Sequence, residues 1–238
     1  MQLVNQAKKF FYLSCLVLLL LKLRDISQPQ AHFDWQNYGQ ALSKLFNYWQ
    51  IGQPFSAPNA NVSPSLYATQ PLVMQGGDPY IRALMRTITA SEANVSHPYN
   101  VIYGGEQIDD LSSHPEVCVT IVAGPNIGNC TTAAGRYQML DFTWSKQAQK
   151  YHPNPSGIWR WQTYSFEAQY QDAVVHSWLS DTNAWGTDIP QLLRQGEITQ
   201  VLKLLSGTWT SLGYGIETNS MSSYLPQIYQ NMLTQELS

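Results

Sequence analysis

The chain has 238 residues, of which 44% are hydrophobic and 12% charged, so it can bury one full-sized core and still supply a leader and an arm. Its net charge is −3 and its isoelectric point about 5.9, and no basic stripe is available to neutralise phosphates, which excludes nucleic acid as an expected partner. Fourteen Tyr and eight Trp among many neutral polar residues suit a surface that binds sugars, although single aromatic residues most often belong to the core.

The amino terminus carries an apolar run. Lys8 and Lys9 precede it, and it extends over residues 10–21, about 18 Å of helix, which is short of the ~30 Å hydrocarbon core of a bilayer but fits the apolar part of a secretory signal. We interpret residues 1–31 as a cleaved signal peptide or an uncleaved membrane anchor. Both interpretations export the rest of the chain to the periplasm, and the second makes the inner membrane a partner.

Residues 32–77 lie between this leader and the predicted catalytic domain. Apolar residues recur at helical spacing from residue 33 to residue 49, which predicts an amphipathic helix that docks on the domain or on lipid. Residues 51–75 are rich in Pro, Asn, Ser and Gln without a sustained period, so we expect an extended connector.

The next segment has the signals of a well-defined helix. Asp78 can cap the first free amides, and Pro79 stands where its missing N–H costs nothing. An apolar stripe follows at helical spacing, formed by Ile81, Leu84, Met85 and Ile88. Glu92 lies four residues beyond Ile88, so its carboxyl group is expected at the edge of the core, an environment suited to a general acid.

A β-rich excursion follows the helix. Val101–Tyr103 and Val117–Val122 are predicted strands of a small antiparallel sheet, separated by Gly-rich turns. Turn-forming residues lie between Cys118 and Cys130, so the two thiols can face each other across a hairpin. In an exported protein a disulfide is expected, whereas two free thiols would fit a reducing cytosol. No metal site is expected, because neither cysteine belongs to a close Cys/His cluster.

The carboxyl-terminal half is predicted to be helical. Three stripes of helical period cover residues 166–178, 198–205 and 221–232, separated by Pro190 and by the turn around Tyr214. The expected fold class is therefore α+β: a helical body with a small antiparallel sheet that forms one wall of a cleft for a polymer. We assign residues 78–238 to this domain and expect a monomer.

These residues carry a resemblance to a known family. The chain from Asp78 to its carboxyl terminus resembles the endolysins of bacteriophage lambda and its relatives, chiefly through Ser91-Glu92, Tyr99–Glu106, Ser113–Pro115, Ala134–Gln138, Gln171–Val174 and Trp209–Gly215. The resemblance implies a lysozyme-like fold, lytic transglycosylase activity on peptidoglycan without a cofactor, and Glu92 as the sole catalytic acid and base.

The resemblance also implies residues that bind the glycan. Gly135 and Gln138 would line the sugar groove, and Tyr214 would help to orient Glu92. Further candidate contacts are Ser91, Asn100, Tyr103 and Tyr137. Packing is an equally good interpretation of Tyr137 and Tyr214, and a structural role is preferred for Arg136.

The number of suitably placed carboxylates also bears on the chemistry. Ordinary glycosidases use two of them, but the other candidates here are predicted in a solvated loop (Glu106, Asp109 and Asp110) or as a helix cap (Asp141). With one carboxyl group, the C6 hydroxyl of N-acetylmuramic acid would attack C1 of the same sugar and leave a 1,6-anhydro end. The alternatives are a hydrolytic muramidase that uses the same Glu and a non-catalytic protein that binds cell-wall glycan.

Overall fold

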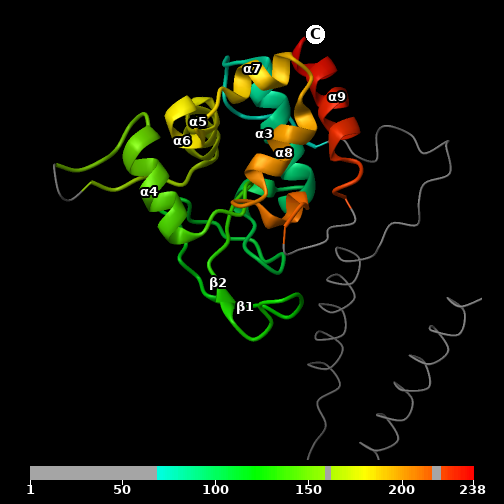
Figure 1. Cartoon of the computed structure of the whole chain (residues 1–238). Coiled ribbons are helices and arrows are strands. Elements are labelled where there is room, and N and C mark those ends of the chain that lie inside the picture. Colours follow the sequence, from blue (N-terminus) through cyan, green and yellow to red (C-terminus); the bar gives the residue numbers. More distant parts are fainter. Residues whose placement is uncertain (1–68, 159–161, 216–220) are drawn as a thin grey trace, which may run out of the picture. The chain divides into compact units, whose positions relative to one another are not determined.

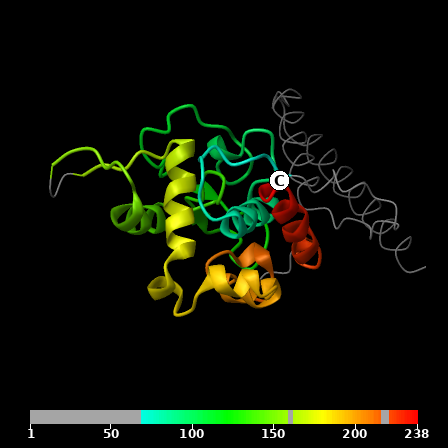
Figure 2. The ribbon, with the colours of Figure 1, turned by 90° about the horizontal axis from the view of Figure 1, so that it is seen from above.

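Helix α3 (Pro79–Glu92) is the central helix of the computed structural model, which describes residues 69–158, 162–215 and 221–238 (Figure 1). It packs against helices α5 (Ala168–Ser180), α7 (Ile189–Arg194) and α9 (Leu225–Glu236). Seen from above, α3 lies between α5 and α9 (Figure 2). The predicted leader, the predicted helix over residues 33–49 and most of the connector lie outside the described residues.

The start and end of α3 agree with the sequence. The Asp78 side chain accepts a hydrogen bond from the Tyr80 amide at 2.9 Å, and Glu92 is the last helical residue. The predicted one-sided stripe was too narrow, however, because helices surround α3 on several sides and bury Thr87 and Thr89 as well. Each threonine hydroxyl satisfies itself by donating to a backbone carbonyl four residues earlier.

The remaining elements follow in chain order. They are η2 (Pro98–Asn100), β1 (Val119–Thr120), β2 (Cys130–Thr131), α4 (Asp141–Tyr151), α5, α6 (Thr182–Trp185), α7, α8 (Ile198–Leu205), η4 (Thr210–Leu212) and α9. Helices α5, α8 and α9 confirm the three carboxyl-terminal stripes. Pro190 stands in the first turn of α7, where proline is tolerated, so it begins a helix as well as separating two.

The sheet is a single short hairpin within the described residues. Strands β1 and β2 are antiparallel, with Val119 opposite Thr131 and Thr120 opposite Cys130. The predicted disulfide is confirmed: Cys118 and Cys130 are joined, with their Cα atoms 5.5 Å apart. The helical body with this hairpin confirms the α+β prediction.

The predicted strand over Val101–Tyr103 was wrong. Val101 and Ile102 instead form isolated bridges, to Gln107 and Ala134 respectively. The reason is local: Gly104 and Gly105, at φ of +88° and +89°, turn the chain back at once and leave no room for a longer ladder.

The folded unit begins before the predicted boundary at residue 78. The amides of Val73 and Met74 donate to the buried Asp172 carboxylate at 2.9 and 3.1 Å, and Leu72 is buried. Thr69, also buried, offers its carbonyl to Arg86 at 2.8 Å. Residues 69–77 are therefore an arm of the domain and not the end of a free connector.

The two ends of the described chain meet along α3. Glu236 of α9 pairs with Arg82 and Arg86 of α3 at 2.5 and 3.0 Å. Because these groups are largely buried, the pairs hold α9 in register against α3. Among the described helices, none is long and apolar enough to cross a bilayer.

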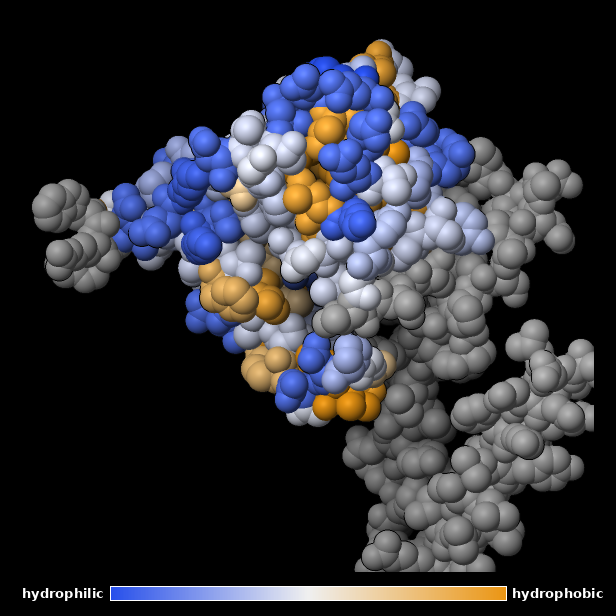
Figure 3. Space-filling view, in the orientation of Figure 1, coloured by the Kyte–Doolittle hydropathy of each residue, from blue (hydrophilic) through white to orange (hydrophobic). Residues whose placement is uncertain are grey.

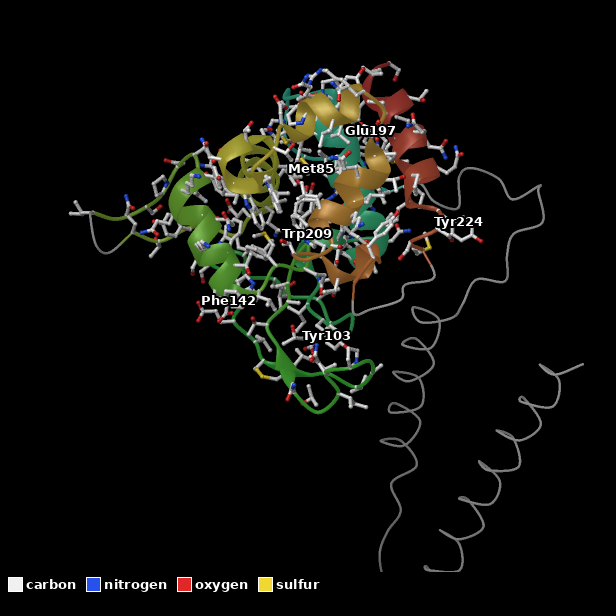
Figure 4. The ribbon with its side chains drawn as sticks, viewed as in Figure 1. Met85, Tyr103, Phe142, Glu197, Trp209 and Tyr224 are labelled. Carbon is white, nitrogen blue, oxygen red and sulfur yellow. A yellow bond between two sulfur atoms is a disulfide. The ribbon has the colours of Figure 1, made fainter. Side chains whose placement is uncertain are left out.

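Figure 3 shows apolar surface on the hairpin and around the start of α4. The exposed apolar side chains of these elements are Val117, Val122, Ile127 and Phe142. Figure 4 shows Phe142 at the end of α4 that faces the hairpin, while Met85 lies within the helical body. The hairpin therefore keeps its form through the disulfide and its turn, with little burial of its own apolar groups.

His176 should make stability depend on pH. Its Nε2 accepts the amide of Asp78 at 3.1 Å, which requires the neutral ring, and burial lowers the pKa of His176 below its ordinary value of 6.5. Burial also lowers the pKa of His114 and His152. As the pH falls, the unfolded chain takes up protons before the folded one. The contribution of these histidines to the free energy of unfolding is therefore fully present above pH 6.5 and is lost as the pH is lowered beneath it.

Urea unfolding between pH 7.5 and pH 5 measures this effect. We expect His176→Gln, which keeps an acceptor that does not titrate, to reduce the slope of unfolding free energy against pH. His97→Gln, at an exposed position, is the matched control and should leave the slope unchanged. Equal slopes for the wild type and His176→Gln would contradict the assignment.

Candidate functional site

Glu92 ends the buried helix α3 beside the short helix η4. The hydroxyl of Ser211, in η4, forms a short hydrogen bond with Oε1 of Glu92 and lies 3.1 Å from Oγ of Ser91. All three side chains are partly buried. The carboxyl group is therefore held at the end of a rigid element and at the edge of the core, as the sequence predicted.

Helix η4 is held in place by Trp209, the residue directly before it. This side chain is buried, and its indole N–H donates to the carbonyl of Tyr137 at 2.9 Å. Its ring centroid lies 5.4 Å from that of Trp178 in α5. Figure 4 shows Trp209 within the helical body, between the α-helices and the segment that carries Tyr103. The position of Ser211 is thus tied to the turn around residue 137.

That turn is the segment Ala134–Met139, closed by hydrogen bonds in both directions between its end residues. Gly135 has φ of +72°, and a Cβ atom there would come within 2.3 Å of Oε1 of Gln171 and 2.7 Å of the Phe166 ring. Only glycine fits such a position. The expected place of Gly135 in the sugar groove is therefore corrected: its backbone is buried against α5.

Gln138 is held by backbone carbonyls. Its side-chain amide donates to Gly135 at 2.9 Å and to Val101 at 3.2 Å, and its φ of +44° is unusual for a residue with a side chain. It lines a small cavity of about 40 Å³ together with Trp178, Trp209 and neighbouring residues. A constrained, half-buried amide at this point fits a residue that is set in place for a ligand.

A buried polar network lies behind the turn. The hydroxyl of Tyr99 accepts from Arg136 at 3.0 Å and donates to Asp172 at 2.8 Å, and the hydroxyl of Tyr137 donates to the other oxygen of Asp172 at 2.6 Å. Desolvation, followed by the charge of Asp172, raises the pKa of both tyrosines, so both remain donors. Arg136 also donates to Thr89 of α3 at 2.8 Å, which confirms its structural role.

This network corrects the expected role of Tyr137. The side chain is 1% exposed, and its hydroxyl is committed to Asp172. It therefore has no surface to offer to a glycan, and the packing interpretation of Tyr137 is the correct one.

The loop that carries Asn100 and Tyr103 lies beside the same turn. Gly135 donates its amide to the carbonyl of Val101 at 2.8 Å, and Tyr103 donates its amide to Ala133 at 2.9 Å. The side chain of Asn100 donates to the carbonyl of Ile108 at 2.9 Å, so it closes its own loop. Two segments about thirty residues apart in sequence are thus joined next to Gln138.

Tyr214 follows η4 on the exposed side. It is 50% exposed and has φ of +66°, a strained conformation for a non-glycine residue. Gly213, which precedes Tyr214, lies close to Ser222: a Cβ atom at position 213 would lie 2.5 Å from Oγ of Ser222. The ring of Tyr214 is available to a ligand, and its role in orienting Glu92 stays a prediction.

The other acidic residues agree with the sequence in part: the three loop residues are exposed, but the predicted cap at Asp141 was wrong, because Leu140 takes the cap position of α4 and no side chain caps the helix. The loop residues are Glu106, Asp109 and Asp110. Asp141 begins α4 and accepts from the Thr132 hydroxyl at 2.9 Å, a bond that lowers the pKa of Asp141. Within the described residues, no group of three or more His, Cys, Asp or Glu side chains could hold a metal ion.

Ser211 is the functional candidate that sequence reasoning missed. It lies in the Trp209–Leu212 motif, one of those on which the resemblance rests, but nothing in the order of residues indicates that this motif folds back onto Glu92. Its separation from Glu92 by 119 positions explains the omission.

Replacement of Gly135 should be costly. Gly135→Ala combines a strained φ with a clash against Gln171 and Phe166, and we expect a loss of about 2–5 kcal/mol in the free energy of unfolding. Urea unfolding followed by circular dichroism measures it. Gly105→Ala is the control, because φ is +89° but no atom lies within 4 Å, so strain alone should cost about 1 kcal/mol. Equal losses in both variants would show that the contact with α5 is unimportant.

A family model described as Endolysin matches residues 82–235, which is more than half of the chain. The endolysin of Escherichia phage lambda is 33% identical over 123 residues, a match that covers 50% of this chain and 66% of that relative.

Two solved structures are also similar. One is bacteriophage lambda lysozyme complexed with a chitohexasaccharide, at 25% identity and a TM-score of 0.49, covering 67% of this chain and 97% of that one. The other is lysozyme from bacteriophage lambda, at 21% identity and a TM-score of 0.46, covering 69% of this chain and 96% of that one.

Proposed function

Because the chain belongs to the endolysin family, we propose that it cleaves the glycan strands of peptidoglycan between N-acetylmuramic acid and N-acetylglucosamine as a lytic transglycosylase. The observation that carries this proposal is Glu92, which lies inside the matched range, ends the central buried helix and is held by the hydroxyl of Ser211. A carboxyl group in such a setting suits proton transfer to a sugar oxygen.

Glu92 enters the first step in its protonated form. It donates its proton to the glycosidic oxygen as the bond between that oxygen and C1 of N-acetylmuramic acid breaks. Positive charge develops at C1, and the 2-acetamido group of the substrate can stabilise it. The leaving sugar departs with a neutral hydroxyl.

In the second step the Glu92 carboxylate acts as a base. It removes the proton of the C6 hydroxyl of the same N-acetylmuramic acid, and the C6 oxygen forms a bond to C1. The product is a 1,6-anhydro end, and Glu92 is protonated again for the next cycle. One carboxyl group therefore performs both proton transfers.

The setting of the other acids supports a single-carboxylate mechanism. The three acidic residues of the loop after Gly105 are exposed, and Asp141 is engaged by Thr132. A glycosidase with two carboxylates needs the second one on the opposite face of the scissile bond. Hydrolysis by Glu92 with water as the nucleophile is the alternative outcome, and glycan binding without cleavage is the other.

We assign the glycan contacts to the loop at Asn100 and Tyr103, to Gln138 in the neighbouring turn and to Tyr214 after η4. Gln138, Asn100 and Tyr103 belong to two segments joined by backbone hydrogen bonds, and Tyr214 presents an exposed ring beyond η4. Aromatic rings and amide groups of this kind are suited to stacking on sugars and to bonding their hydroxyl and acetamido groups. Ser91 is not assigned a glycan contact, because it contacts Ser211 and acts on Glu92 through that residue.

We also propose that the domain works outside the cytoplasm, as a monomer on peptidoglycan. The Cys118–Cys130 disulfide supports this location, because such bonds persist in oxidising compartments. Residues 1–31 would provide the signal peptide or the anchor in the inner membrane.

Product analysis tests the reaction class. Purified protein incubated with sacculi should release muropeptides that carry 1,6-anhydro-muramic ends, which mass spectrometry distinguishes from reducing ends by the mass of one water. Reducing ends alone would assign the protein as a hydrolase. No release of muropeptides would leave only glycan binding.

Glu92→Gln should abolish cleavage, with a loss of at least about a thousandfold in kcat, because the amide keeps the shape of the side chain but cannot donate and recover a proton. Turbidity of a sacculus suspension measures the activity, and co-sedimentation measures retained binding. Glu106→Gln, in the exposed loop, is the matched control and should remain active. Full activity of Glu92→Gln would remove Glu92 from the mechanism.

A further inference from the structure

The number of hydroxyl protons limits how Ser91, Ser211 and Glu92 can hydrogen-bond to one another. Ser91 donates its hydroxyl proton to the carbonyl of Ile88 at 3.1 Å, so its oxygen can only accept from Ser211. Ser211 has one proton and lies within hydrogen-bond range of two oxygens, Oγ of Ser91 and Oε1 of Glu92. It can donate to only one of them at a time.

The two arrangements serve the carboxylate and the acid that carries its proton on Oε1, the oxygen beside Ser211. When Glu92 is a carboxylate, Ser211 donates to it. When Glu92 is protonated, its own O–H can donate to Ser211, and Ser211 turns its proton toward Ser91. Each arrangement leaves every hydroxyl proton bonded, and no heavy atom has to move.

We propose that Ser211 is a positioning residue that holds Glu92 in one place in both protonation states, with Ser91 as the acceptor that makes the exchange possible. The proposal rests on the proposed function, in which the same carboxyl group must act first as an acid and then as a base. A residue that could only donate, such as Lys or Trp, would hold the carboxylate but could not accept the proton of the acid.

The surrounding structure holds Ser211 firmly enough for this role. Leu212 is fully buried, and Trp209 is bonded to the carbonyl of Tyr137. Gly213 ends η4 directly after Ser211 and Leu212, at a position where an added Cβ atom would strike Ser222. Helix η4 is therefore anchored on both sides of the serine.

The charged groups of the elements packed around α3 have partners of their own. Helix η4 carries no titratable side chain. The others are Glu236 of α9 with Arg82 and Arg86, Arg194 of α7 with Asp78, Asp172 of α5 with Tyr99 and Tyr137, His176 of α5 with the Asp78 amide, and Arg136 with Thr89. Substitution of Ser211 leaves all these pairs intact, so its effect on Glu92 can be measured against a constant background.

The test compares Ser211→Thr with Ser211→Val. The two side chains have nearly the same shape, but only Thr has a hydroxyl. We expect Thr to retain near wild-type kcat on sacculi and Val to lose about tenfold in kcat with KM nearly unchanged, the size of one positioning hydrogen bond. Ser180→Val removes a hydroxyl that bonds a backbone carbonyl at 2.8 Å on α5, and it should leave kcat unchanged.

A second readout does not require activity. The pKa of Glu92 can be measured by NMR titration of the ¹³C-labelled carboxyl group, with Glu92→Gln used to assign the signal. Ser211→Val removes a donor to the carboxylate and should raise the pKa of Glu92, and the alkaline limb of the kcat profile should move to higher pH. Ser91→Ala removes the acceptor needed by the protonated state and should lower the pKa of Glu92.

Opposite changes in Ser211→Val and Ser91→Ala, with Thr restoring the wild-type behaviour, support the proposal. Equal kcat and equal Glu92 titration in Ser211→Thr and Ser211→Val would overturn it. If the wild-type protein does not cleave sacculi, the proposed function fails, while the titrations still decide whether Ser211 serves both states of Glu92.

Discussion

The buried Asp172 carboxylate is the constraint on which the rest of the domain depends. A charge away from water is tolerated only when every lone pair is used, and Asp172 receives two backbone amides from the arm and two tyrosine hydroxyls. Those donors come from three separate segments, the arm over residues 69–74, the loop at Tyr99 and the turn at Tyr137. Arg136 extends the network to α3 through Thr89. Loss of one donor would leave the buried carboxylate less completely hydrogen-bonded, so the three segments stabilise one another.

The candidate site depends on this network through backbone contacts. The turn over Ala134–Met139, fixed by Arg136, Tyr137 and the close approach of Gly135 to α5, presents its carbonyl at residue 137 to the indole of Trp209. Trp209 in turn sets the start of η4, and η4 brings Ser211 to Glu92. The carboxyl group thus stands at the end of a chain of buried contacts, whereas Tyr214 is exposed.

The helical body and the hairpin differ in how they are stabilised, and this difference follows from the same packing. Helix α3 is surrounded and carries the carboxyl group at its end, while the hairpin lies outside the core and keeps apolar residues exposed. A two-residue ladder has little stability of its own, and the Cys118–Cys130 bond compensates for that. The helical body therefore holds Glu92 in a packed setting, whereas the hairpin depends on its disulfide and leaves its apolar residues exposed.

The sequence by itself determined the local elements: the Asp78-Pro79 start and Glu92 end of α3, the carboxyl-terminal helices, the cysteine pair and the family. These depend on capping, period and short spacings, which act between neighbours in the chain. Only the tertiary structure decided that α3 is buried all round, that Gly135 and Tyr137 serve packing, that residues 69–77 belong to the domain, and that Ser211 contacts Glu92. Each of these depends on which segments, some of them 154 positions apart, compete for the same buried volume and hydrogen bonds, and no local pattern records that outcome.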